Sequence, residues 1–165
     1  METKVSPTAA ALAYQKKMMN PFIFWWAMFF KLPSVLFWKI RMQKLDTTSC
    51  EVQIPYGWRT QNPFKSIYFA ALAGAAELST GALGQMALAG RGAFSMLVVD
   101  FKAEYSKKAN TRITFSCQQG KEVFDLIDSL QAGESKVLTL ISIGKNTQEE
   151  EVARFYITWS FKRKS

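Results

Sequence analysis

Histidine is absent from the 165-residue sequence. Without an imidazole, the chain cannot carry a Ser-His-Asp or Cys-His nucleophile system, and it lacks a side chain common at zinc and iron sites. The two cysteines, Cys50 and Cys117, are far apart in the sequence and form neither a CxxC motif nor a disulfide framework. Both lie in strand-like runs, so we expect buried free thiols. We predict no metal site and no cofactor.

We expect neither a secretory targeting segment nor a membrane-spanning segment. Residues 1–13 contain no long apolar run before a small-residue cleavage site, unlike a secretory signal. The apolar run 22–30 is much shorter than the ~20 residues that a spanning helix needs. The longer stretch 66–90 contains Glu77, Gln85 and four glycines, which suit a spanning helix poorly. We therefore expect a cytoplasmic protein.

Acidic residues are scarce in the N-terminal quarter of the chain. The net charge is +8, and residues 1–45 hold seven Lys/Arg but one acid. A nucleic-acid-binding protein would spread its basic residues over the folded surface, so we predict no nucleic-acid partner. The basic surplus lies beside eight aromatic residues within 22–38. Three interpretations stay open for this aromatic segment: core or dimer packing, a lining or cover for an acyl tunnel, and contact with a membrane surface.

Length and hydrophobic patterning predict one α+β domain over residues 1–165, with an N-terminal aromatic helical segment at 1–42 and a core at 43–162. Helical periodicity predicts helices at 8–19, 21–31, 34–41, 66–88 and 121–131. Alternating apolar residues predict strands at 45–55, 96–105, 111–117, 136–143 and 151–161, with a turn at 106–110. We expect an antiparallel sheet of five or six strands wrapped around the long Ala-rich helix.

Glu77 is the only charged residue between Lys65 and Arg91. It lies in a predicted helix that is apolar on all faces and that we therefore expect to be buried. The small side chains of this helix would let neighbouring strands or helices approach closely. A buried carboxylate costs free energy unless it is paired or neutralised. One interpretation is structural: Glu77 accepts hydrogen bonds from strands or pairs with a distant arginine, Arg91 included. The other is functional: burial raises its pKa and makes it a general base or nucleophile.

The loop before this helix supplies the remaining candidate residues. Asn62 precedes a proline and either forms an ordinary turn or orients a water or a substrate carbonyl. Ser66 is a candidate helix N-cap, and we expect it to bind substrate together with Tyr68, Phe69 and Ala70. Unpaired N–H groups near Tyr68, Phe69 and Ala70 can polarise a carbonyl oxygen, because the helix dipole favours negative charge there.

Asn62, the helix opening at Ser66–Ala70 and an acid fifteen residues after the asparagine resemble the hotdog-fold acyl-CoA thioesterases. Their pattern is Asn-x-x-Gly-x-x-His-Gly-Gly followed by Asp or Glu. The resemblance covers roughly residues 40–162, and the aromatic helices before it resemble a thioesterase-like branch of unassigned function. It implies a hotdog fold and hydrolysis of a coenzyme A or acyl carrier protein thioester. The relatives place the site between two chains, which implies a homodimer or a dimer of dimers.

The resemblance also implies roles for individual residues. Glu77 would be the general base or nucleophile, the N–H groups of Phe69 and Ala70 would hold the thioester oxygen, and Asn62 would position water or substrate. Three basic residues could contact coenzyme A phosphates or be ordinary surface charges: Lys107, Lys108 and Arg112.

Two departures from the family pattern favour an alternative. Lys65 replaces the family glycine, and Tyr68-Phe69-Ala70 replaces His-Gly-Gly. The added side chains limit how closely a thioester can approach the start of the helix. The alternative is a non-catalytic hotdog protein that binds fatty acyl groups or serves as a structural dimer. A dehydratase is disfavoured because that chemistry generally needs a histidine beside the acid.

Overall fold

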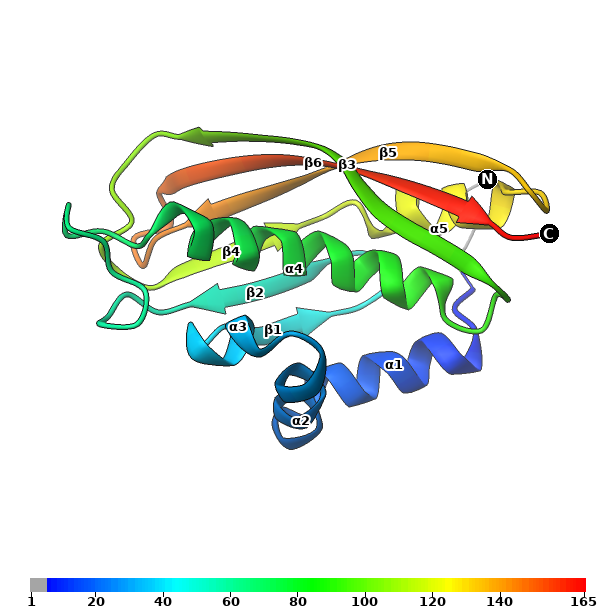
Figure 1. Cartoon of the computed structure of the whole chain (residues 1–165), viewed down its shortest axis with the longest axis horizontal. Helices are drawn as coiled ribbons and strands as arrows, with labels where there is room; N and C mark the ends of the chain where they lie inside the picture. The colour runs from blue at the N-terminus through cyan, green and yellow to red at the C-terminus, as the bar shows by residue number, and fades with distance from the viewer. Residues whose placement is uncertain (1–5) are drawn as a thin grey trace.

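The computed structural model describes residues 6–165, in which an antiparallel sheet encloses a long helix. Figure 1 shows the helix α4 lying along the inner face of the curved sheet. The strands are β1 (Arg41–Leu45), β2 (Cys50–Ile54), β3 (Phe94–Tyr105), β4 (Ile113–Cys117), β5 (Ser135–Lys145) and β6 (Glu151–Arg163). The helices are α1 (Ala9–Met19), α2 (Pro21–Lys31), α3 (Pro33–Phe37), α4 (Phe69–Leu88) and α5 (Gly120–Ser129). The predicted α+β architecture, a six-stranded sheet around an Ala-rich helix, is confirmed.

The strand order is β1-β2-β4-β5-β6-β3, and every pairing is antiparallel. Segment 106–110 was predicted as a turn between neighbouring strands. It instead begins the connection from β3, at the edge of the sheet, to β4, which β5 and β6 separate from β3. β3 pairs along its whole length with β6, from Phe94 opposite Arg163 to Tyr105 opposite Ala153. Within residues 6–165, no strand pairs with the other side of β3, so this long strand is an open edge.

The structure differs from the prediction before β2. The predicted strand 45–55 is interrupted by a turn, because Asp46 Oδ1 accepts hydrogen bonds from the backbone N–H groups of Thr48 and Ser49, both at 2.8 Å. The predicted helix 34–41 ends early because Lys39 adopts a left-handed φ of 55°. The chain that follows forms β1, which pairs with β2 as a hairpin.

Small residues of α4 allow tight packing, as predicted. A Cβ at Gly74 would lie 2.8 Å from the ring of Trp38, and one at Gly81 would lie 3.4 Å from the ring of Trp159. On the sheet side, the buried Ser79 hydroxyl bonds to that of Ser142 at 2.7 Å and ties α4 to β5. The two cysteines are buried and free, and they face each other in register between β2 and β4.

The three N-terminal helices group beside β1 (Figure 1). Side chains cap the first two: Thr8 accepts from Ala11 N at 3.0 Å, and Asn20 accepts from Phe22 N at 3.0 Å. α1 packs against both β1 and α4, so the N-terminal helices cover one side of the central helix. Over residues 6–165, none of the helices is both long and apolar enough to cross a bilayer.

Candidate functional site

Glu77 lies near the middle of α4 and is half-buried. It borders a cavity of about 610 Å³ between α4 and the N-terminal helices. Most of the cavity lining is apolar, and its residues include Tyr14, Lys17, Ile23, Met28, Lys31, Leu32, Leu78, Met96 and Trp159. Glu77 therefore borders a largely apolar, partly open cavity.

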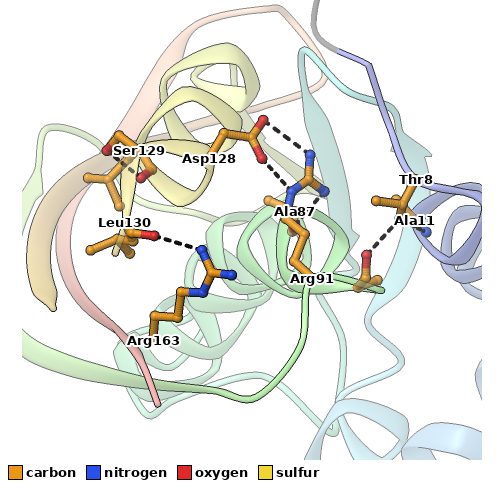
Figure 2. A network of polar contacts seen from close by, with 10 residues as sticks. Thr8, Ala11, Ala87, Arg91, Asp128, Ser129, Leu130 and Arg163 are labelled. Carbon is orange, nitrogen blue, oxygen red and sulfur yellow. Dashed lines mark hydrogen bonds and ion pairs between the residues drawn. The ribbon is translucent and has the colours of Figure 1, made fainter. Parts of the chain in front are cut away.

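The Glu77 carboxylate has no ion-pair or hydrogen-bond partner within the part of the chain that the structure describes. Burial raises the pKa of Glu77, because desolvation disfavours the charged form and no close cation offsets it. Arg91, one partner that the sequence left open, instead forms a bidentate pair with Asp128 of α5, with Nε 2.6 Å from Oδ1. Figure 2 shows this pair and a third hydrogen bond, which Arg91 Nη1 donates to Ala87 O at 2.8 Å. An unpaired, desolvated carboxylate beside a cavity suits proton transfer or nucleophilic attack.

Three neighbours of Glu77 were not identified from the sequence. Burial raises the pKa of Tyr14 from α1, and the nearby Cys50 and Glu77 add to this effect. Thr80 accepts a hydrogen bond from Trp159 Nε1 at 3.0 Å and donates to the Glu77 carbonyl at 2.9 Å. Thr80 lies one turn after Glu77 on α4, whereas only the tertiary fold brings Tyr14 of α1 and Trp159 of β6 to this region.

The start of α4 lies two turns before Glu77. The helix begins at Phe69, after Tyr68 in an extended conformation with φ −61° and ψ 133°. Ser66 as the N-cap is wrong, because Ile67 N and Tyr68 N donate to Ala109 O and Thr60 O, both at 2.7 Å, and keep the chain extended. The N–H groups of Phe69 and Ala70 have no acceptor in residues 6–165, which leaves two aligned donors at the positive end of the helix dipole.

The Asn62 side chain shapes the loop ahead of these donors. Its Oδ1 accepts from Phe64 N at 2.9 Å and from both the backbone N–H and the hydroxyl of Ser66 at 3.2 Å. Its Nδ2 donates to Ile67 O at 3.4 Å. The turn chemistry that the sequence offered as one alternative is therefore present. A contact of Asn62 with water or substrate stays a prediction.

A second cavity of about 580 Å³ lies at the helix start. Its lining includes Asn62, Phe64, Ser66, Tyr68, Phe69, Leu72, Tyr105, Lys107 and Lys108. The exposed rings of Tyr68 and Phe69 pack edge to face with centroids 4.9 Å apart, where the family pattern has His-Gly. Lys107 pairs with Glu150, and Lys108 Nζ lies 3.4 Å from Phe64 O. The cavity thus combines free backbone donors, aromatic rings and nearby ammonium groups.

One chain does not bring the acid and the helix start together. Glu77 lies eight residue steps after Phe69 on the α-helix, about 12 Å along the axis, and the two residues border different cavities. The open-edge strand borders both cavities, with Met96 in the lining of the first and Tyr105 in that of the second. As for metals, no cluster of three or more Cys, Asp or Glu side chains in the described range could hold an ion.

One known family model matches most of the chain. Residues 21–161 match the model described as a domain of unknown function, DUF4442. The chain belongs to this family. Among proteins of curated function, none matches the sequence significantly. Membership of this family therefore assigns no activity to the chain.

Solved structures with the same fold cover nearly the whole chain. A protein of unknown function from Pseudomonas aeruginosa, called a probable thioesterase, superposes with a TM-score of 0.71 at 19% identity, covering 96% of this chain and 99% of that chain. A protein of unknown function from Chlorobaculum tepidum gives 0.74 at 12% identity, covering 96% and 98%. A thioesterase from Haemophilus influenzae gives 0.65 at 13% identity, covering 82% and 87%. The expected hotdog fold is confirmed, and two of these similar structures carry the name thioesterase.

Proposed function

We propose that this protein hydrolyses an acyl thioester of coenzyme A or acyl carrier protein, at a site formed by two copies of the chain. The observation that carries the proposal is Glu77, an unpaired carboxylate beside a largely apolar cavity of about 610 Å³. A cavity of this size lies within the ~300–1,000 Å³ typical of small-molecule sites. The thioesterases among the structures of the same fold support the reaction class.

The proposed dimer forms along β3, an open edge of twelve residues. Its exposed apolar side chains include Leu97, Val99, Phe101 and Tyr105, which favours coverage by another chain. A two-fold axis through the middle of the strand would pair two copies of β3 antiparallel. The Met96 end of one copy would then lie beside the Tyr105 end of the other. This arrangement would bring the Glu77 cavity of one chain next to the helix start of the second.

The chemistry of such a composite site follows from its groups. Glu77 removes a proton from water, and the resulting hydroxide attacks the thioester carbonyl carbon. The carbonyl oxygen gains negative charge, which the N–H groups of Phe69 and Ala70 at the facing helix start stabilise. The C–S bond then breaks, and the leaving thiolate takes the proton from Glu77. Direct attack by the carboxylate, with an acyl-enzyme anhydride hydrolysed afterwards, is the alternative course.

The two cavities suggest where the parts of the substrate bind. The apolar lining of the Glu77 cavity suits a hydrocarbon acyl group. Lys107 and Lys108 border the other cavity, where an ammonium group can contact a carrier phosphate. Free, buried Cys50 and Cys117 are consistent with the cytoplasm as the proposed compartment.

A substitution of the acid tests the proposal. Glu77→Gln keeps the shape of the side chain but removes the base, so we expect hydrolysis to fall by about 100-fold or more. A free-thiol assay over short, long and aromatic acyl-CoAs, and over acyl carrier protein thioesters, measures this loss. Unchanged turnover in the variant would remove Glu77 from the mechanism.

A non-catalytic acyl-binding protein is the second candidate. It is favoured by the exposed rings of Tyr68 and Phe69, which stand at the helix start where the family pattern has His-Gly. Denaturing mass spectrometry of the purified protein would detect a retained acyl species. A bound acyl group together with no hydrolysis by the wild-type chain would support this candidate over the thioesterase.

A further inference from the structure

The outer face of α2 presents five aromatic rings, the aromatic face: Phe22, Trp25, Trp26, Phe29 and Phe30. The rings contact one another, with Trp25 stacked on Phe29 at 5.3 Å and Trp26 on Phe30 at 6.0 Å. Phe22 and Phe30 are 72% and 75% exposed. A contiguous exposed patch of this kind marks an interaction surface.

The opposite side of the same helix is already covered. Phe24 and Met28 are buried, and Ile23, Ala27 and Met28 line the Glu77 cavity. The aromatic face is therefore additional to the core packing of α2 and separate from the residues that line the cavity. The packing interpretation of the aromatic segment accounts for only one side of this helix.

The surroundings of the aromatic face are basic. Residues 6–45 contain six Lys/Arg and no Asp or Glu. Beside Trp25, a groove of about 630 Å³ between α2, α3 and β1 is lined by three cations, Lys39, Arg41 and Arg59, which we call the basic groove. None of the three has a carboxylate partner in residues 6–165. Three unpaired cations in a groove with apolar walls suit an anionic phosphate headgroup.

Charge also decides against a second copy of the chain as the occupant. Two copies related by a two-fold axis would meet through identical patches. The basic groove of one copy would then lie near the basic groove of the other copy or near the lysines that surround that groove. Like charges that meet at an interface cost free energy. An anionic bilayer complements the cations and accepts the aromatic rings at the level of its headgroups.

We infer that α2 docks on an anionic phospholipid bilayer, with the aromatic face in the interface and the basic groove on the lipid phosphates. The helix would lie in the plane of the surface, since its eleven residues are too few to span the bilayer. This inference does not depend on hydrolysis by Glu77, and either can fail alone.

Co-sedimentation of the full chain with vesicles tests the inference. We expect binding to vesicles of equal parts phosphatidylcholine and phosphatidylglycerol at low salt, and little binding to phosphatidylcholine alone. Binding should weaken at about 1 M salt, where the Debye length falls to ~3 Å. A blue shift of tryptophan fluorescence on adding vesicles should accompany it. Absence of binding to the anionic vesicles at low salt would overturn the inference.

Two pairs of variants locate the surface. Phe22→Ser/Phe30→Ser and Lys39→Glu/Arg59→Glu should each reduce partitioning by about tenfold or more. Their matched controls should bind like wild type. These controls are Val137→Ser on β5, an apolar side chain 61% exposed, and Lys162→Glu/Lys164→Glu, the same change of charge near the C-terminus. Figure 1 places that terminus at the right-hand end of the molecule, away from α2.

Two other outcomes would overturn the assigned surface or its assigned occupant. Equal loss in the charge control would mean a response to net charge alone and would overturn the assigned surface. Self-association of the wild type that Phe22→Ser/Phe30→Ser abolishes, without vesicle binding, would assign the face to a second copy instead. Circular dichroism melts of all variants establish that each is folded.

Discussion

Gly81 and Glu77 are in contact across one turn of α4. A Cβ placed on Gly81 would lie 3.2 Å from Glu77 Oε1 and 3.4 Å from the ring of Trp159. The absence of a side chain at Gly81 therefore helps to set the position of the carboxylate. It leaves the acid room between the helix and β6, at the wall of the cavity.

Gly81→Ala tests this relationship. The added methyl should displace the carboxylate and lower kcat/KM by about ten- to a hundredfold, since small displacements of a reacting group have effects of this size. Stability should change little, because the helix preference of alanine over glycine, about 1 kcal/mol, offsets the crowding that the methyl causes beside Glu77 and Trp159. Gly74→Ala, which crowds the Trp38 ring at 2.8 Å instead, is the control. We expect it to destabilise by about 1–3 kcal/mol with normal activity per folded molecule. Equal activity losses in both variants would contradict a local effect on Glu77.

The pH dependence of hydrolysis should report the environment of the acid. A general base must be ionised, and burial raises the pKa of Glu77. We therefore expect kcat/KM to fall with decreasing pH through a midpoint above the ordinary range of a carboxyl group. A pH profile with the slowest-reacting acyl-CoA measures this. A midpoint at or below the ordinary glutamate pKa would show that the acid is solvated during the reaction.

The same pKa shift predicts that ionised Glu77 lowers the stability of the folded protein at neutral pH. Because the folded state raises the pKa of Glu77, its stabilising contribution is present below the unfolded-state pKa and is lost as pH rises through the folded one. Glu77→Gln should therefore melt higher than wild type at neutral pH, with the difference shrinking in acid. Glu134→Gln, outside the proposed dimer edge, is the control, because the backbone N–H of Gln131 lowers the pKa of Glu134 and the expected effect has the opposite sign. A neutral-pH melting temperature below wild type for Glu77→Gln would contradict a desolvated carboxylate.

The open edge at β3 should be the site of self-association. Leu97→Glu/Val99→Glu places charges on two exposed apolar positions of this strand, so we expect a folded monomer with little hydrolytic activity. Val137→Glu on the interior strand β5 changes a comparable exposed side chain and should stay dimeric and active. Size-exclusion chromatography with light scattering, paired with the thiol assay, measures both properties. A double variant that remains dimeric and active would exclude the β3 pairing.

Much of the fold could be predicted from local patterns. Pro21 at the first turn and the Lys31–Pro33 stop fixed the bounds of α2, and the run of small residues around Glu77 predicted a buried α4. The hairpin before β2 was missed because a single side chain, Asp46, makes the turn within an alternating pattern.

The candidate site was less predictable because long-range contacts build it. Ser66 is not the helix cap, since Ile67 N bonds to Ala109 O in a segment 42 residues away. Tyr14 approaches Glu77 only because α1 packs on α4, which no spacing in the sequence encodes. The sequence also could not show that Arg91 pairs with Asp128 of α5 beyond the C-terminal end of α4 (Figure 2).

Subunit mixing requires one variant for each half of the proposed composite site. Glu77→Gln removes the acid. Phe69→Pro removes one helix-start donor while fitting the backbone, because proline suits the first helical position and the extended Tyr68 suits the residue before it. Phe69→Ala, which loses the ring but keeps the N–H, controls for the side chain and should stay active. Each of the two inactivating variants should be nearly inactive as a homodimer.

The most direct measurement is the activity of the two inactive variants after unfolding and refolding together. If each site joins Glu77 of one chain to the helix start of the other, mixed dimers carry one intact site. The mixture should then recover about a quarter of wild-type activity, since half of randomly formed dimers are mixed. If acid and donors act within one chain, no intact site forms, and a mixture as inactive as its parents would contradict the shared site.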